Sequence, residues 1–184
     1  MSSKLFTPLR IGKLELANRI AVSPMCQYSA VDGTMTDWHL QHLANLALSG
    51  AGLLIVEATG VMSEGRISPG CAGLYSDDNE QAMKRVIGFV RSISPVKLGI
   101  QLGHAGRKGS SHRPWQGRGP LKPEEGAWPT LAPSAVPLAP GWPTPGALDR
   151  AGMDAVRQAF VDAVRRAQRI GFDRKAGWLL THRV

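Results

Sequence analysis

The chain has 184 residues, of which 43% are hydrophobic and 20% charged, a composition typical of a globular domain that excludes disorder of the whole chain. Its formal charge of +8 is concentrated in residues 103–122 and 150–184. Neither segment has the interleaved aromatics of a nucleic-acid-binding surface, and no stretch reaches the roughly 18 apolar residues of a membrane span. We therefore expect no nucleic-acid partner and no membrane partner.

The amino-terminal residues 1–16 contain no apolar core of the length found in signal peptides. The two cysteines, Cys26 and Cys71, form no CxxC motif and lie in dissimilar sequence contexts. Neither a disulfide framework nor a zinc site is therefore indicated. These features predict a soluble, cytoplasmic protein in a reducing compartment.

The first third of the chain predicts a hairpin, two strands and a helix. Apolar and polar residues alternate about a Gly-Lys turn in 9–16, which is typical of a short hairpin. A first buried strand is expected in 19–24, and a helix capped by Thr36 follows, with Trp38 on its apolar stripe. The continuous apolar run in 53–58 is typical of a parallel strand covered on both faces.

The rest of the chain continues the alternation of helices and strands. A helix is expected from Asp77 or Asp78 to Ile93, and a third strand in 97–102. Residues 103–146 hold most of the prolines and three of the five tryptophans, so we expect a packed loop with no regular element. A third helix is predicted from about 151 to 170, with a favourable pair between Asp162 and Arg166.

This order of elements predicts an α/β fold with right-handed crossovers and a parallel sheet. Two architectures fit, a doubly wound open sheet and a (β/α)₈ barrel. Rossmann and P-loop glycine spacings are both absent from the sequence, which favours the barrel. A complete barrel typically needs about 250 residues, so this chain would hold about half of one.

Functional residues of parallel α/β folds lie at the carboxyl ends of the strands. Here those ends read SPMCQYS from Ser23, EATG from Glu57 and QLGHAGRK from Gln101. Strand alternation places Gln101 on one face with Gly99 and Gly103, leaving space for a flat ligand with mixed hydrogen-bonding edges. The alternative is a glutamine that is hydrogen-bonded inside a packed barrel.

Several long phrases in register carry a more specific signal. They read LFTPLRIGKLELANRI, SPMCQYS, TDWHLQHL, GLLIVEATGV, EGRISPGCAGLYSD, GIQLGHAGRK and RAQRIGFD. Together they resemble the Old Yellow Enzyme family of FMN-dependent oxidoreductases (NADH:flavin oxidoreductases and NADPH dehydrogenases), in its bacterial thermophilic-like or xenobiotic-reductase branch. The resemblance covers 5–173, which is about the first half of a family member.

The resemblance implies a (β/α)₈ TIM barrel that holds FMN, takes electrons from NADPH or NADH, and passes hydride to an activated alkene or a nitro compound. It assigns cofactor-binding positions to Ser23, Pro24, Met25, Cys26, Gly60 and Gln101. Cys26 and Tyr28 would be catalytic, with Cys26 tuning the flavin and Tyr28 contacting substrate. Ile67 would border the substrate pocket, and Gly60 stands where the family usually has alanine.

Plainer interpretations of the same residues stay open. Cys26 taken alone is as well explained as an inert buried thiol. His39 and His42 are spaced like metal ligands, but no third ligand accompanies them, so packing is favoured and no metal is expected. His104 and Arg107 belong to a family phrase and are expected to anchor the loop.

Family members carry a pair of substrate-binding histidines shortly after the phrase GFD, whereas residues 174–184 diverge from the family here. We therefore expect one partial TIM-barrel domain over 1–184, with an aborted fourth strand, from a truncated or frameshifted reductase gene or an incomplete sequence. Such a chain would have little activity, and would form a homo-oligomer if the fold were completed. The alternatives are a basic binding module and a defective fragment without flavin.

Overall fold

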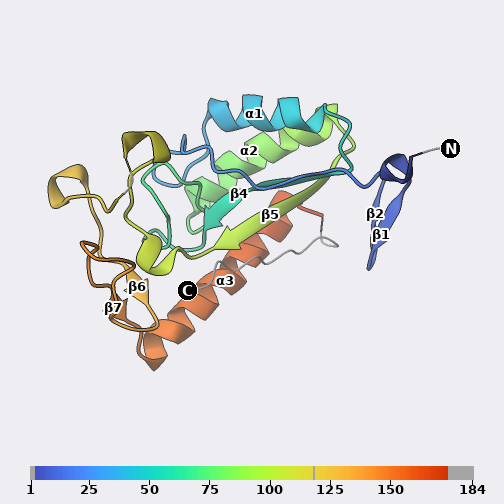
Figure 1. Ribbon diagram of the computed structural model, residues 1–184. Coiled ribbons are helices and arrows are strands. Elements are labelled where there is room, and N and C mark those ends of the chain that lie inside the picture. The colour runs from blue at the N-terminus through green and yellow to red at the C-terminus, as the bar shows by residue number, and fades with distance from the viewer. Residues whose placement is uncertain (1–2, 118, 174–184) are drawn as a thin grey trace.

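The computed structural model describes residues 3–117 and 119–173. Its centre is a parallel sheet of three strands in the order β3-β4-β5, each followed in the chain by a helix (Figure 1). The strands are β3 (Ala21–Val22), β4 (Leu53–Gly60) and β5 (Lys97–Gly103), and the helices are α1 (Asp37–Ala47), α2 (Asp77–Ile93) and α3 (Arg150–Ile170). The predicted strand–helix alternation is confirmed, and the described strands form an open sheet rather than a closed barrel.

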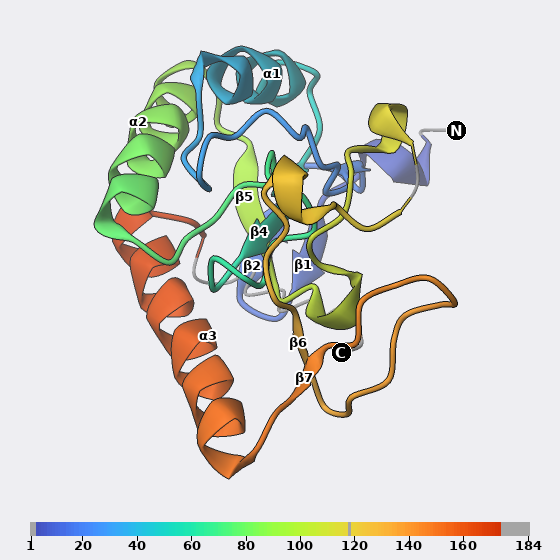
Figure 2. The same ribbon diagram turned by 90° about the vertical axis from the view of Figure 1, so that its left-hand side faces the viewer.

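The helices follow one another in an arc around one side of the strands (Figure 2). The core lies between this arc and the sheet, and it includes Leu54, Val56, Leu98, Ile100, Leu102, Val86, Ile87, Val90, Ala163 and Ala167. Because side chains alternate along a strand, Gln101 and Gly103 face away from the helices. The sheet therefore has one apolar face packed on helices and one face that carries small and polar residues.

Polar caps set the helix boundaries close to where the sequence predicts them. The Ser76 hydroxyl accepts from the Asn79 N–H at 3.1 Å, and the Asp149 carboxylate accepts from the Gly152 N–H at 2.7 Å. Gly171 ends α3 in the left-handed conformation, at φ 98°, where glycine carries no Cβ penalty. None of the helices in the described part of the chain combines the length and apolar character that a bilayer crossing requires.

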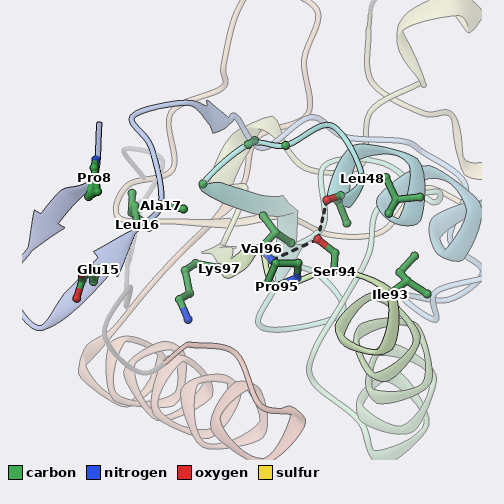
Figure 3. A pocket seen from close by; sticks show the side chains of 14 residues that line it. Pro8, Glu15, Leu16, Ala17, Leu48, Ile93, Ser94, Pro95, Val96 and Lys97 are labelled. Carbon is green, nitrogen blue, oxygen red and sulfur yellow. Dashed lines mark hydrogen bonds between the residues drawn. The ribbon is translucent and has the colours of Figure 1, made fainter. Parts of the chain in front are cut away.

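The hairpin of β1 (Leu9–Ile11) and β2 (Leu14–Leu16) is confirmed, and its inner leucines pack on Leu53. It lies at the amino ends of β4 and β5, where a groove opens between it and the ends of α1 and α2 (Figure 3). Two residues that line this groove are joined by a hydrogen bond, in which the Ser94 hydroxyl donates to the Ala47 carbonyl at 2.7 Å. The groove lies at the opposite end of the strands from the predicted functional edge.

The long loop after β5 is packed, as expected, but it is not free of regular structure. It contains three single 3₁₀ turns and one strand of the short parallel pair formed by β6 (Leu131–Ala132) and β7 (Gly146–Ala147), so the prediction of no regular element is wrong. The Trp128 indole donates to the Glu64 carbonyl at 3.0 Å, and the Arg66 guanidinium lies 5.3 Å from the Trp128 ring. Aromatic packing therefore holds this loop against the segment after β4.

Three local predictions need correction. The first strand is confined to Ala21–Val22. Trp38 is 54% exposed, because its indole donates to the Gln27 side chain instead of packing in the core. The expected Asp162–Arg166 pair does not form, since Asp162 pairs with Arg165 at 3.2 Å and Arg166 reaches residues of α2.

The start of the predicted fourth strand lies beside β5. The Asp173 N–H donates to the Leu98 carbonyl at 3.0 Å, and its carboxylate accepts from the Leu98 N–H at 2.8 Å. The remainder of that strand, the divergent tail 174–184, lies outside the described residues.

Glu80 ties the start of α2 to the end of α3. Its side chain is 11% exposed and accepts from Arg166 at 2.8 Å and from Arg169 at 2.7 Å. These guanidinium groups, Arg169 foremost, lower the pKa of the Glu80 carboxyl. The ion pairs therefore stabilise the folded chain while Glu80 is ionised.

We predict that Glu80→Gln lowers the free energy of unfolding by about 1–2 kcal/mol at neutral pH, measured by urea denaturation. The modest size reflects solvent screening, because Arg169 is 58% exposed. The control Asp154→Asn removes two exposed ion pairs within α3, with Arg150 and Arg157, and should cost less than about 0.5 kcal/mol. Equal effects of the two changes would contradict this role of Glu80.

The same variant predicts a pH dependence. A depressed folded-state pKa gives stability that is fully present above the unfolded value of about 4.3 and is lost as pH falls through the folded value. The difference between the parent chain and Glu80→Gln should therefore be constant from neutral pH to about pH 5 and shrink in more acidic solution. A difference that persists at the acid limit would count against the ion pairs.

Candidate functional site

The segment 23–29 lies beyond the carboxyl end of β3 and is fastened to β4 by a buried carboxylate. Glu57 is 4% exposed, and it accepts from the Gln27 backbone N–H at 3.1 Å. Its other oxygen lies 3.4 Å from Nε2 of His39, a residue that is 1% exposed. The His39 Nδ1 accepts from the Thr36 N–H at 3.0 Å, which leaves Nε2 as the ring nitrogen nearest Glu57, although it makes no hydrogen bond there.

Tyr28 adopts an uncommon backbone conformation at the end of this segment, with φ 54°. Its carbonyl lies so close to Gly70 that a Cβ there would be only 2.2 Å away. The Tyr28 ring meets the Trp115 ring edge to face at 5.5 Å. Burial is the main cause that raises the pKa of the Tyr28 hydroxyl, so the phenol stays protonated at neutral pH.

The structure brings Cys26 next to Cys71, which the sequence did not suggest. Both are free thiols; Cys71 is 1% exposed and Cys26 is partly exposed. The Cys71 sulfur lies 3.4 Å from both the backbone nitrogen and the hydroxyl of Ser68. Interaction with the Cys26 thiol and these Ser68 contacts lower the pKa of Cys71 to about 6, whereas the neighbouring Cys71 sulfur and burial raise the pKa of Cys26.

Gln101 lies on the sheet face turned away from the helices, in register with Ala58 of β4. It is 8% exposed, and its side-chain amide makes no hydrogen bond within the described residues. A Cβ placed on nearby Gly103 would meet no atom within 4 Å. An amide that makes no hydrogen bond within the described residues and lies beside open space fits a planar ligand with donor and acceptor edges, such as a flavin ring.

Packing against neighbouring residues, and not room for a ligand, explains why a glycine stands at position 60. A Cβ there would lie 3.0 Å from the Arg66 side chain and 3.2 Å from the Met62 carbonyl. The Gly60 backbone also donates to the Ala72 carbonyl at 2.8 Å and accepts from the Leu74 N–H at 2.9 Å. The absence of a side chain at Gly60 therefore makes room for Arg66 and Met62 of the following loop. A flavin on the other side would meet only the Gly60 backbone.

A small cavity lies at the carboxyl ends of β4 and β5, and its lining includes Gly60, Ile67, Cys71, Gly103 and His104. His104 is 3% exposed, and its Nδ1 accepts from the Gly106 N–H at 3.1 Å. Burial lowers the pKa of His104, which keeps the ring neutral. Arg107 donates to the Ser134 hydroxyl at 3.2 Å, so the contacts of both residues agree with the predicted anchoring of the loop.

The structure thus brings most of the predicted residues to one edge of the sheet. Cys26, Tyr28, Gly60, Ile67 and Gln101 lie on or beside the carboxyl ends of the strands, while Ser23 and Met25 are exposed on the segment after β3. Pro24 lies between them. Among the described residues no cluster of three or more potential metal ligands occurs.

Sequence reasoning missed Glu57 and Cys71. Glu57 stood inside an apolar strand, and a charged residue within such a run was the available signal for a buried partner. Cys71 lay in a quoted family phrase, but nothing in its spacing from Cys26 indicates that the two thiols meet.

Sequence comparison identifies relatives across nearly the whole chain. The profile described as NADH:flavin oxidoreductase / NADH oxidase family matches residues 4–174. An NADH:flavin oxidoreductase from Gibberella zeae is 43% identical, over 94% of this chain and 42% of the relative. An NADPH dehydrogenase from Geobacillus thermodenitrificans is 40% identical, over 94% of this chain and 47% of the relative. The chain spans somewhat less than half the length of these two relatives.

Solved structures give the same picture. Morphinone reductase is 28% identical with a TM-score of 0.77, over 92% of this chain and 46% of that one. Morphinone reductase in complex with tetrahydroNAD is 26% identical with a TM-score of 0.77, over 94% of this chain and 48% of that one. An Old Yellow Enzyme from a Pichia species is 26% identical with a TM-score of 0.76, over 92% of this chain and 44% of that one. The α/β arrangement therefore matches the amino-terminal half of Old Yellow Enzyme barrels.

We predict that Glu57→Leu lowers the free energy of unfolding by about 2–3 kcal/mol, because the Gln27 N–H loses its buried acceptor and the buried His39 ring loses the neighbouring carboxylate. Urea denaturation measures this change. The exposed Glu124 provides the matched control, and Glu124→Leu should stay within about 0.5 kcal/mol of the parent chain. A neutral Glu57→Leu variant would show that the carboxylate does not fasten the segment.

Proposed function

Because the chain belongs to the NADH:flavin oxidoreductase / NADH oxidase family, we propose that it provides flavin-binding and substrate-facing residues of an FMN-dependent NADPH dehydrogenase of the ene-reductase type. One observation carries the proposal. Gln101 is 8% exposed, its side-chain amide makes no hydrogen bond within the described residues, and it lies beside the open space at Gly103 on the sheet face away from the helices. This is the arrangement that a flavin ring edge would complete.

The segment after β3 would form one wall of the flavin site. Ser23, Pro24, Met25 and Cys26 would line the ring, Gly60 would approach it through its backbone, and Gln101 would hydrogen-bond its polar edge. Bound FMN, reduced by NADPH or NADH, would supply the hydride for an activated alkene or a nitro compound. The relative named NADPH dehydrogenase and the morphinone reductase solved with tetrahydroNAD support a nicotinamide reductant.

Cys26 and Tyr28 would act as protonated groups at neutral pH. The raised pKa of the Cys26 thiol favours the neutral S–H form, which would place a polarisable but uncharged atom near the ring. The raised pKa of Tyr28 likewise keeps its O–H available to donate to a substrate oxygen. Ile67 would border the space that the substrate enters, since it lines the cavity at the same strand ends.

The chain spans somewhat less than half the length of the two sequence relatives described above, so the activity of a whole enzyme belongs to this proposal. The histidine pair of the family would fall after Asp173, where residues 174–184 diverge from the family and contain no such pair. Little or no hydride transfer by this chain alone, a homo-oligomer if the fold is completed, and a single partial-barrel domain over 1–184 are proposed on the same basis.

The basic-module alternative has less support from the described residues. Arg166 and Arg169 of α3 pair with Glu80, and Arg150 and Arg157 pair with Asp154. These arginines of α3 therefore form ion pairs within the fold, which explains part of the positive charge of the helix without a nucleic-acid partner.

We predict that Gln101→Leu weakens FMN binding about tenfold, because the ring loses a hydrogen bond at a buried edge. Titration of the purified chain, followed by quenching of flavin fluorescence, measures the dissociation constant. The loss should be the same for riboflavin as for FMN, since Gln101 would face the ring and not the phosphate.

Gln168→Leu is the matched control, because Gln168 is exposed on α3; it should leave the dissociation constant within about twofold. Two results would contradict the proposal. One is a parent chain that binds neither flavin, and the other is equal binding by the parent chain and Gln101→Leu.

A further inference from the structure

Cys26 and Cys71 are the only cysteines of the chain, and the fold brings them into one site from two separate segments. The Ala30 N–H donates to the Gly70 carbonyl at 2.9 Å. Gly70 also lies against the Tyr28 carbonyl, with no room for a side chain. The residues that flank the cysteines are therefore packed backbone to backbone, which brings the two thiols near each other.

The two sulfurs have different environments. Cys71 is buried, and its sulfur has the N–H and the hydroxyl of Ser68 at 3.4 Å as stabilising partners. These contacts favour its thiolate at neutral pH. Within the described residues, the Cys26 sulfur has no such pair of N–H and hydroxyl contacts. Neighbouring Cys71, burial and the Glu57 carboxylate raise the pKa of Cys26, so that it keeps its proton at neutral pH. Of the two, Cys71 is therefore the sulfur whose contacts stabilise a thiolate.

Small molecules have two routes of approach to this pair. Cys26 is partly exposed on the segment after β3. Cys71 lines the cavity at the carboxyl ends of β4 and β5, beside the open space at Gly103. A nucleophilic sulfur with a second thiol nearby is the arrangement of a redox-sensitive cysteine and its resolving partner.

We propose that Cys26 and Cys71 form an oxidative modification site at which a peroxide converts the two thiols into a disulfide. The Cys71 sulfur attacks the peroxide, an S–O bond forms, the O–O bond breaks and hydroxide leaves. The Cys26 sulfur then attacks the Cys71 sulfenic acid, the S–S bond forms and the S–O bond breaks. The Cys26 proton leaves with that oxygen as water. The two sulfurs lose two electrons, which reduce the peroxide.

This site goes beyond the proposed oxidoreductase function and does not depend on it, because the reaction needs only the chain and a peroxide. In a flavin-binding chain the disulfide would also replace the Cys26 thiol beside the ring. Disulfides of this kind in reducing compartments are usually transient or redox-sensing.

The test treats the purified, fully reduced chain with hydrogen peroxide, then denatures it and alkylates the remaining thiols with N-ethylmaleimide. Intact mass is expected to show a species that has lost two hydrogens and takes up no alkylating groups, and dithiothreitol should restore both sites. Peptide mapping should recover a Cys26–Cys71 crosslink. Recovery of two alkylatable thiols, or of disulfide-linked dimers without the internal crosslink, would overturn the proposal.

The single variants test the assigned order. In Cys26→Ser, Cys71 should accumulate as a sulfenic acid that dimedone traps, because its resolving thiol is gone. In Cys71→Ser, Cys26 should remain largely alkylatable after the same exposure. Rapid trapping of Cys26 by dimedone in Cys71→Ser, with an unreactive Cys71 in Cys26→Ser, would overturn the order proposed here.

Discussion

The buried carboxylate of Glu57 is the contact on which the candidate site depends. It joins three elements that are distant in the sequence, since β4 carries it, the Gln27 N–H comes from the segment after β3, and His39 comes from α1. A charged group buried to this extent is tolerated only when its oxygens have partners. The need to satisfy Glu57 therefore fixes the segment that presents Cys26 and Tyr28.

The two faces of the sheet have different roles: one packs against the helices, and the other is the proposed ligand-binding face. Leu98, Ile100 and Leu102 pack against the helices, so that face supplies apolar burial. Gln101 and Gly103 face the other way, where the Gln101 amide makes no hydrogen bond within the described residues and the glycine leaves space. Because the chain belongs to the NADH:flavin oxidoreductase / NADH oxidase family, a flavin ring is the ligand that we propose for this face.

The sequence predicted what depends on local patterns. The start of α1 followed from the cap Thr36, and the orientation of Gln101 followed from strand alternation. Trp38 was misplaced because periodicity cannot register its hydrogen bond to Gln27. The contact between Cys26 and Cys71 was missed for a related reason, since pairings across long loops leave no periodic trace in a single sequence.

The central claim is that the face carrying Gln101 binds a flavin ring. Amide NMR spectra of the isotope-labelled chain, recorded while riboflavin is added, test it most directly. The account predicts shifts for the amides of 99–103, Gly60 and 25–28, with the amides on the outer side of α3 unchanged. Shifts confined to α3 or to the groove beside the hairpin, or no shifts at saturating riboflavin, would contradict it.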